Sequence, residues 1–362
     1  MVTLFGRSWT RDEIMRHVGS LSQVGGVRVS ELQEGIGRGV RVAEFETGSG
    51  LTFNVLLDRG MDIGAAKYRG ASLAWESTVG PAHPAFAERS GLGWLRTFHG
   101  GLVAGCGMTT AGAPSVDEGQ ELGLHGRLNH LPADGVWADG AWRGDTYEMW
   151  ARGRMRETVV FGENLSLTRR IWAHLGESRI FLRDVVVNEG YQTTPHMMLY
   201  HVNFGFPLLA EGTELIAPSR KVTPRDAVAA PGLDGHARYE APIEGYQEQV
   251  FYHDMATDGD GYVTVVLANR GFEDGKGLGV YLKYRQAELP RFGQWKMVGA
   301  GTYVTGLEPA NCLVEGRDKD RERGILQFLE PGDQREYLLE IGVLDGVAEI
   351  DALADQIRSM QS

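Results

Sequence analysis

The chain has 362 residues, of which 42% are hydrophobic and 23% charged, a composition typical of a globular protein that buries a large core. Its formal net charge of −12 argues against a general binder of nucleic-acid backbones, because such a binder needs a basic surface. The two cysteines, Cys106 and Cys312, are too few for a disulfide scaffold and lack CxxC spacing, so we expect buried thiols.

Neither a secretory signal nor a transmembrane segment is evident in the sequence. Residues 1–11 contain no apolar signal core, and no run of about 18 apolar residues occurs. We therefore predict a cytoplasmic protein with no membrane partner and no nucleic-acid partner. A group of arginines is interpreted as solvated strand positions: Arg152, Arg154, Arg156, Arg169 and Arg170.

Residues 1–25 are predicted to form an N-terminal helical extension. Thr10 and Glu13 have the spacing of a capping box, and Ile14 and Val18 follow at helical spacing, so we expect a helix from Arg11 to Val18. A second amphipathic helix is predicted over 347–360, at the other end of the chain.

Between these helices the sequence is dominated by short segments of alternating polarity. The main predicted strands are 27–30, 40–45, 51–56, 147–153, 165–172, 180–188, 197–206, 249–253, 262–269, 278–284 and 336–343. Their regular spacing and glycine punctuation are typical of an antiparallel sandwich, which we take to be one domain over residues 1–362. Residues 77–123 are expected to form a long irregular excursion, and residues 218–242 a loop.

The candidate chemistry lies in three short stretches. Residues 123–130 place His125 and His130 around Gly126, whose missing side chain would let a ligand approach the backbone. His201 lies in a later predicted strand, and Glu308 follows the strand-like residues 302–305, so we expect Glu308 at a strand end. Histidine exchanges protons near neutral pH, and apolar surroundings raise the pKa of a carboxylate, so general acid/base work fits these residues. The alternative for Glu308 is a surface carboxylate in a turn.

Other chemistries find less support in the sequence. No HxH or HxxxH pair indicates a metal site, and neither a GxSxG elbow, a P-loop nor a GxGxxG motif is present. We expect no bound metal and no cofactor. Asp58 and Arg59 either pair with each other at a strand end or contribute directly to a polar pocket.

Four motifs in chain order resemble the aldose 1-epimerase, or galactose mutarotase-like, superfamily, in particular its divergent bacterial branch labelled a domain of unknown function. The motifs are Leu124-His125-Gly126, Tyr200-His201-Val202-Asn203-Phe204, Leu307-Glu308-Pro309 and Pro331-Gly332-Asp333. The resemblance covers residues 51–343 and implies a large antiparallel β-sandwich, a supersandwich, with a sugar groove across one sheet.

The resemblance also implies roles for individual residues. His201 would be the general acid at the ring oxygen of a sugar, and Glu308 the general base at the anomeric hydroxyl. His125 would hold the substrate, and Arg96 would clamp hydroxyls, although the sequence around Arg96 departs from the family pattern. The substrate-binding candidates together are His125, Arg96, His99, Arg59, Asp254 and Trp295. Asp254 stands for the family aspartate, and Trp295 either stacks on a sugar or belongs to the core.

Three functional hypotheses follow. The first is a carbohydrate epimerase that interconverts the anomers of an aldose, as a monomer or homodimer, with a small sugar as its partner. The second is an isomerase or lyase acting on a sugar or sugar acid, with a metal held by His99, His125, His201 or Glu308. The third is a non-catalytic carbohydrate-binding protein. For the first, we expect His201 and Glu308 to flank a groove at a distance that spans a pyranose ring.

Overall fold

Two large antiparallel β-sheets form the framework of the computed structural model, which describes residues 1–360. Within that range, the first sheet has eight strands in the order β11-β12-β13-β14-β24-β20-β19-β16. Their bounds are Asp134–Arg143 (β11), Thr146–Thr158 (β12), Asn164–His174 (β13), Arg179–Asn188 (β14), Gln334–Leu344 (β24), Leu278–Arg285 (β20), Tyr262–Asn269 (β19) and Glu214–Ile216 (β16).

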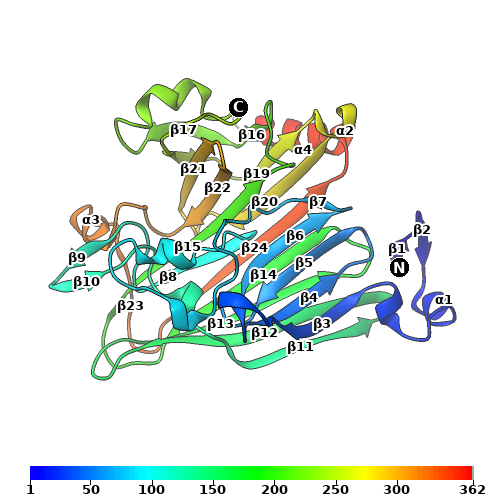
Figure 1. Ribbon diagram of the computed structural model, residues 1–362, viewed down its shortest axis with the longest axis horizontal. Coiled ribbons are helices and arrows are strands. Elements are labelled where there is room, and N and C mark those ends of the chain that lie inside the picture. The colour runs from blue at the N-terminus through cyan, green and yellow to red at the C-terminus, as the bar shows by residue number, and fades with distance from the viewer. Residues whose placement is uncertain (361–362) are drawn as a thin grey trace.

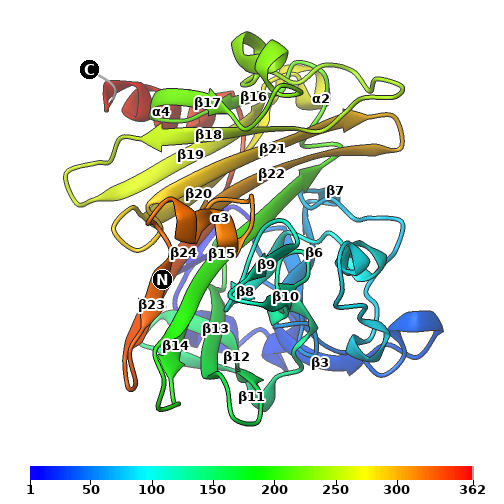
Figure 2. The same ribbon diagram turned by 90° about the vertical axis from the view of Figure 1, so that its left-hand side faces the viewer.

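The second sheet has twelve strands in the same range. Ten of them follow the order β17-β18-β21-β22-β15-β8-β6-β5-β4-β3, while β23 pairs with β15 and β7 pairs with β6. Their bounds are Ser219–Pro224 (β17), Gln249–Met255 (β18), Arg291–Gly299 (β21), Thr302–Ala310 (β22), Thr194–Gly205 (β15), Val103–Met108 (β8), Asp62–Tyr68 (β6), Leu51–Leu56 (β5), Arg41–Glu46 (β4), Gly26–Glu31 (β3), Gln327–Leu329 (β23) and Ala71–Ser72 (β7). Figure 2 shows β18, β21, β22 and β15 running side by side.

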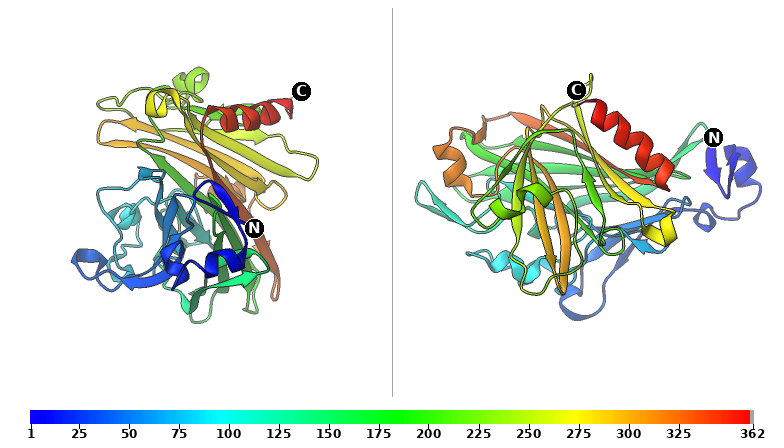
Figure 3. Two further views of the ribbon diagram at one scale, coloured as in Figure 1. Left: turned by 90° about the vertical axis from the view of Figure 1, so that its right-hand side faces the viewer. Right: turned by 90° about the horizontal axis from the view of Figure 1, so that it is seen from above.

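The remaining elements lie at the ends and edges of the sheets. The two hairpins are β1 (Val2–Leu4) with β2 (Arg7–Trp9), and β9 (Ser115–Asp117) with β10 (Gln120–Leu122). The α-helices are α1 (Arg11–Met15), α2 (Phe272–Gly275), α3 (Arg317–Glu322) and α4 (Val347–Ser359), and the 3₁₀ turns are Leu21–Gln23, Gly35–Gly37, Pro84–Phe86, Gly93–Thr97, Leu128–His130 and Ala230–Gly235. The N-terminal hairpin and α1 project from one end of the molecule, whereas α4 lies along β19 and β20 (Figures 1 and 3). Among the described helices, none has both the length and the apolar character needed to cross a membrane.

The inner faces of the two sheets share one hydrophobic core. It joins Leu167 and Leu182 of the eight-stranded sheet to Val55, Met198 and Val202 of the twelve-stranded sheet. The side chains between these positions along β15 point the other way, onto the outer face of the twelve-stranded sheet. A smaller core lies on that outer face and consists of Trp94, Phe98, Ala104, Cys106, Ala111, Met197, Leu199, Ala310 and Cys312. The predicted antiparallel sandwich is therefore confirmed, and both cysteines are buried free thiols.

The predicted helices are found at both ends of the chain, with changes in their bounds. The capping box of Thr10 and Glu13 is present, but α1 ends at Met15 and not at Val18, because Ser20 caps a separate turn soon afterwards. The helix predicted over 347–360 is α4, which ends one residue earlier.

Two segments predicted to be irregular contain strands. The excursion over 77–123 includes β8, whose six residues are all buried, so no alternation of polarity marks it in the sequence. The loop predicted over 218–242 includes β17, a polar strand at the edge of its sheet that ends at Pro224. Glu308 is also placed differently: it lies within β22 and not at a strand end.

Candidate active site

His201 and Glu308 lie next to each other on neighbouring strands of the twelve-stranded sheet. Their strands, β15 and β22, are antiparallel and paired at Val202 and Leu307. His201, which precedes Val202, therefore lies beside Glu308, which follows Leu307, and both side chains are on the outer face. His201 Nε2 is 3.2 Å from Glu308 Oε1. The two groups are thus in direct contact, and not separated by the width of a sugar ring as the sequence analysis expected.

Glycines make room for the carboxylate. Gly293 on β21 is the registered neighbour of Glu308, and a Cβ atom there would lie 3.2 Å from Glu308 Oε2. A Cβ atom at Gly306 would lie 2.8 Å from Glu308 Oε1 and 3.0 Å from the His201 ring. A Cβ atom at Gly306 would therefore displace one of the two side chains, and a Cβ atom at Gly293 would require the carboxylate to move by a few tenths of an ångström.

Asn203 determines which nitrogen of His201 faces the carboxylate. The Asn203 Nδ2 group donates hydrogen bonds of 3.0 Å to the carbonyl oxygens of Gly101 and His201. These bonds orient the amide so that its Oδ1 accepts a hydrogen bond from His201 Nδ1. With one proton fixed on Nδ1, His201 Nε2 is the atom that gives or takes a proton toward Glu308.

Burial keeps this contact nearly free of water. The side chains of His201 and Glu308 are 6% and 3% exposed. Burial raises the pKa of Glu308 above its usual value, and the positive charge of a protonated His201 opposes that rise. Glu308 therefore holds a proton more readily than an exposed carboxylate does, and His201 Nε2 lies within hydrogen-bond distance of it.

The pair lies at the base of a pocket of about 630 Å³, a volume suited to a small ligand. Trp295 borders it, half-buried, with its ring centroid 5.3 Å from that of His201 and 6.3 Å from that of Trp75, which also lines the pocket. Trp94 and Phe98 complete an aromatic wall. Such rings can pack against the apolar face of a flat ligand.

His125 lines the same pocket. Its ring stands at 87° to that of His201, with the centroids 5.6 Å apart. Burial lowers the pKa of His125 to about 3, so the imidazole is neutral at pH 7. Within the described residues its Nδ1 atom is buried without a hydrogen-bond partner. Gly126 is required behind it, because a Cβ atom would lie 2.2 Å from the carbonyl oxygen of Thr110.

Two charged residues of the pocket were not found from the sequence. Glu248 accepts a hydrogen bond of 2.8 Å from Trp295 Nε1, and Arg225 lies 3.5 Å from Glu248 through Nη2. Arg225 follows β17 and is held by a backbone hydrogen bond to Val250 of β18. Arg225 and Glu248 are brought near His201 by the pairing of β17, β18 and β21. Their spacing in the sequence therefore gives no sign that they share a pocket with His201.

Four of the predicted binding residues lie outside the residues that line this pocket. Arg59 is fully buried and donates to the carbonyl oxygens of Asn129, Ala82 and Thr97, while Asp58 pairs with Arg41. Arg59 and Asp58 therefore do not pair with each other. The further three are Arg96, which is exposed and lies 3.4 Å from Glu88; His99, which is buried with both ring nitrogens unpartnered; and Asp254, which is exposed on β18 opposite Lys221.

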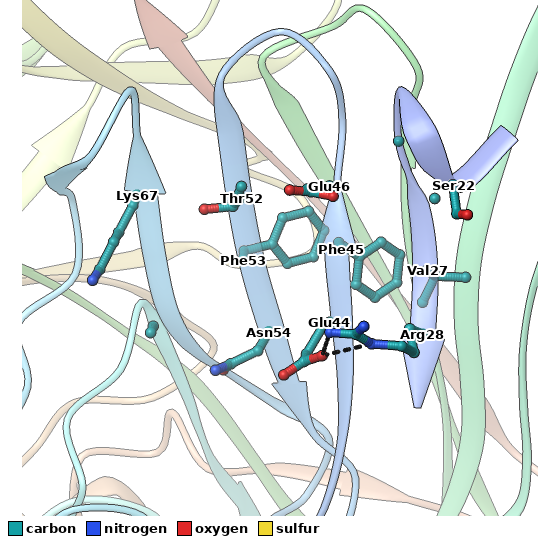
Figure 4. Close-up of a pocket in the computed structure, with 13 residues that line it drawn as sticks. Ser22, Val27, Arg28, Glu44, Phe45, Glu46, Thr52, Phe53, Asn54 and Lys67 are labelled. Atoms are coloured by element: carbon teal, nitrogen blue, oxygen red, sulfur yellow. Dashed lines mark hydrogen bonds and ion pairs between the residues drawn. The ribbon is translucent and has the colours of Figure 1, made fainter. Parts of the chain in front are cut away.

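The other hollows of the surface have a different chemistry. A pocket of about 410 Å³ on the outer side of β3 to β6 is lined by residues such as Thr52, Asn54 and Lys67, and its Arg28 is already bound to Glu44 (Figure 4). It contains no histidine.

Within residues 1–360, no three His, Cys, Asp or Glu side chains are grouped so that they could hold a metal ion.

Comparisons with known proteins support the fold. Residues 37–343 match the model of the family described as "Domain of unknown function (DUF4432)". No curated protein matches the chain. A solved structure from Klebsiella pneumoniae subsp. pneumoniae, described as a "putative aldose 1-epimerase", is 26% identical with a TM-score of 0.88, and the match covers 93% of this chain and 88% of that one.

More distant structures share the architecture. A galactose mutarotase-like protein from Clostridium acetobutylicum is 11% identical with a TM-score of 0.60, and the match covers 89% of this chain and 99% of that one. The galactose 1-epimerase from Lactobacillus acidophilus is 12% identical with a TM-score of 0.53, with coverage of 89% and 99%. At these identities the likeness shows the fold alone, which is the galactose mutarotase-like sandwich that the sequence motifs predicted.

Proposed function

The chain belongs to the DUF4432 domain family, and from this membership and the pocket described above we propose that it is a carbohydrate epimerase that interconverts the anomers of an aldose. One observation carries the proposal: the 3.2 Å contact between His201 Nε2 and Glu308 Oε1 at the base of an aromatic pocket. The resemblance of the fold to the Klebsiella protein points to the same class of reaction.

Two adjacent proton-transfer groups suit the anomeric centre. The hydroxyl oxygen O1 and the ring oxygen are bonded to the same carbon, so both face one side of a pyranose. A carboxylate and an imidazolium in contact can therefore address both oxygens at once, with the sugar ring lying over the pair. Glu308 would remove the proton of O1 while protonated His201 donates its Nε2 proton to the ring oxygen.

His201 and Glu308 together supply and accept every proton that the proposed reaction moves. As the C1–O bond of the ring breaks, a C1=O double bond forms, and the pair passes from imidazolium and carboxylate to imidazole and carboxylic acid. Rotation about the C1–C2 bond presents the other face of the aldehyde. The ring hydroxyl then adds to C1, Glu308 returns a proton to O1, and His201 takes the proton of the hydroxyl. The pair holds one proton throughout, apart from the exchange with substrate.

The surrounding residues would bind the sugar. Neutral His125, with its unpartnered Nδ1, can hydrogen-bond a hydroxyl near the reacting atoms. At the rim, Glu248 and Arg225 offer an acceptor and a donor to more distant hydroxyls, and Trp295 offers a ring edge or face. Glu248 is a better counterpart of a sugar-binding carboxylate than Asp254, because Glu248 lines the pocket.

The test is anomer interconversion measured by NMR magnetisation exchange over a panel of aldoses. We expect the wild-type protein to accelerate exchange for at least one aldose, and the Glu308→Gln variant to slow it by at least about a hundredfold while sugar binding persists, because glutamine fills the same space but cannot accept the O1 proton. Glu211→Gln serves as the control, because it makes the same change of carboxylate to carboxamide at an exposed residue outside the pocket. Undiminished exchange in the Glu308→Gln protein would remove Glu308 as the base, and a ketose product in the same spectra would indicate an isomerase.

A further inference from the structure

The solvent-facing side of the eight-stranded sheet carries two adjacent rows of aligned side chains. In the first row, which we call the arginine row, Arg152 of β12, Arg170 of β13 and Arg183 of β14 are registered partners across the three strands. In the second, the aromatic row, Trp150, Trp172 and Phe181 are registered in the same way, two residues along each strand. Both rows point away from the core, because their neighbours in each strand are buried in it.

The aromatic row contains one stacked pair of rings and a guanidinium that lies near both this pair and the third ring, Trp150, which is 8% exposed. The rings of Trp172 and Phe181 are stacked at 5.2 Å, and the guanidinium of Arg170 lies 4.8 Å from the Trp172 ring and 5.9 Å from the Trp150 ring. Trp137 of β11 closes one end with its edge against Trp150 at 5.2 Å, and its side chain is 56% exposed. Exposed tryptophan and arginine are the residue types most often found where proteins bind ligands and partners.

The arginine row is unfavourable for the free protein. Like charges directly opposite each other on a sheet destabilise it. Glu148 binds Arg170 at 2.8 Å and Glu336 binds Arg183 at 2.7 Å, which neutralises two of the three. Arg152 is exposed, and among the described residues it has no hydrogen-bond or ion-pair partner. The row therefore retains an unneutralised cation beside tryptophan rings, in a chain whose net charge is −12.

A cleft lies over the arginine row and includes Trp150 of the aromatic row in its lining. Its volume is about 580 Å³, and its lining residues are Trp137, Arg143, Trp150, Arg152, Thr168, Arg170, Arg183 and Val185. The His201 pocket opens on the outer face of the other sheet, with the shared core between the two. The cleft is thus a separate site and not an extension of the candidate active site.

We propose that this cleft binds a short anionic saccharide, one that carries a carboxylate or a phosphate. Guanidinium groups bind both anions through paired hydrogen bonds, and tryptophan rings pack against the face of a sugar. The acidic charge of the whole chain disfavours a long polyanion such as a nucleic acid, which would be repelled beyond the cleft. A two-fold contact with a second copy, centred on the row, would place arginine on arginine.

Isothermal titration calorimetry tests the proposal with four probes: tri-galacturonate, glucose 6-phosphate, neutral galactotriose and a short single-stranded oligonucleotide. We expect at least one of the two anionic sugars to bind, and the Arg152→Glu variant to bind it at least about tenfold more weakly, because a repulsive carboxylate replaces the free cation. Arg220→Glu, at an exposed arginine on β17, is the matched control and should leave this affinity unchanged. Arg152→Glu should also fold, since the reversal relieves like-charge repulsion, and its thermal midpoint checks this.

The outcomes separate the alternatives. Loss of tri-galacturonate binding alone assigns a sugar acid, and loss of glucose 6-phosphate binding alone assigns a sugar phosphate. Equal affinity of the wild-type and Arg152→Glu proteins for both anions would overturn the proposal, as would the absence of binding at millimolar concentration. Tighter binding of the oligonucleotide that depends on Arg152 would replace the saccharide with a nucleic acid.

Discussion

The proposed proton transfer by His201 and Glu308 depends on a third side chain, which would act through His201 and not on the sugar itself. Asn203 accepts from His201 Nδ1 and is itself fixed by two carbonyl oxygens, so it acts as a positioning residue. Without that acceptor the imidazole can place its proton on Nε2 in the neutral form. The ring would then present a donor where the second half of the proposed reaction requires it to accept the proton of the sugar hydroxyl.

Replacement of Asn203 by leucine, which has a similar size, should therefore lower kcat by roughly ten- to a hundredfold, as the loss of a residue that orients a histidine commonly does. We expect KM to change little and the pH profile of kcat to shift, because the proton affinity of His201 changes when Nδ1 loses its partner. The measurement is the exchange rate from pH 5 to 9, with Asn54→Leu on β5 as the control. A profile of unchanged shape with a uniformly lower rate would indicate a structural role only.

At the residue level, the sequence indicated part of this site. His125, His201 and Glu308, which short motifs single out, line one pocket, and each motif holds a polar side chain among glycines and apolar residues. Arg225 and Glu248 carry no such mark, because they come from the least periodic part of the chain. Arg59 was predicted to bind substrate, but its guanidinium donates to three buried backbone carbonyl oxygens instead. The sequence does not show this, because the three carbonyl groups come from distant parts of the chain.

At the level of elements, a strand was predicted from the sequence where one of its faces is buried and the other is exposed to solvent. β13 and β14 have one buried and one solvated face, so their alternating polarity is plain in the sequence. β8 is buried on both faces and β17 is polar at a sheet edge, so neither alternates. In β21 the alternation of polar and apolar residues is broken by Gly293, Gln294 and Lys296. Gly293 leaves room for Glu308, and Gln294 and Lys296 form buried hydrogen bonds and do not belong to the hydrophobic core.

A buried ionic cluster ties four strands together beneath the candidate site. Arg169 of β13 binds Asp184 of β14 at 2.7 Å, Tyr200 of β15 donates to the same carboxylate, and Asp62 of β6 lies 3.5 Å from Arg169. Asp184 forms the shorter ion pair with Arg169, and Asp62 accepts a hydrogen bond from the Gly105 amide. Burial raises the pKa of Asp62 to about 7, against the opposing charges of Arg169 and Arg59.

This raised pKa predicts a pH-dependent stability. Between its unfolded pKa of about 4 and its folded pKa of about 7, the native state holds the Asp62 proton more tightly than the unfolded state, so the free energy of unfolding falls as the pH rises. From pH 5 to pH 8 the loss from this group should be about 3 kcal/mol. Asp62→Asn keeps an oxygen for the Gly105 amide and removes the titration, so its stability should lack this decline.

Urea unfolding at pH 5, 6.5 and 8 measures the difference between the two proteins. Because other groups titrate equally in both, only the difference in slope reports on Asp62. Parallel stability curves for wild type and Asp62→Asn would show that Asp62 is ionised in the folded protein.

At the scale of the whole molecule, one continuous core connects the two sheets, and the two proposed binding sites lie on opposite outer faces. We therefore expect the chain to unfold as a single unit, which is how the one domain predicted from the sequence would behave. The C-terminal helix offers the sharpest test, because its small cluster is separate from the main core: Ile350 packs beside Gly279 of β20 and against Leu344 and Val266.

Ile350→Ala should lower the free energy of unfolding by about 2–5 kcal/mol, since it leaves a cavity under α4. If the chain is one cooperative unit, the urea midpoint must shift equally for far-UV circular dichroism, which follows the sheets, and for tryptophan fluorescence, which includes Trp75, Trp94 and Trp295 around the distant pocket. Gln356→Ala, on the exposed side of α4, should shift neither. A separate early transition of small helical amplitude, with the fluorescence midpoint unchanged, would mean instead that α4 detaches on its own. The pocket would then keep its stability without α4, because the strands that carry His201 and Glu308 are held by the main core and by each other.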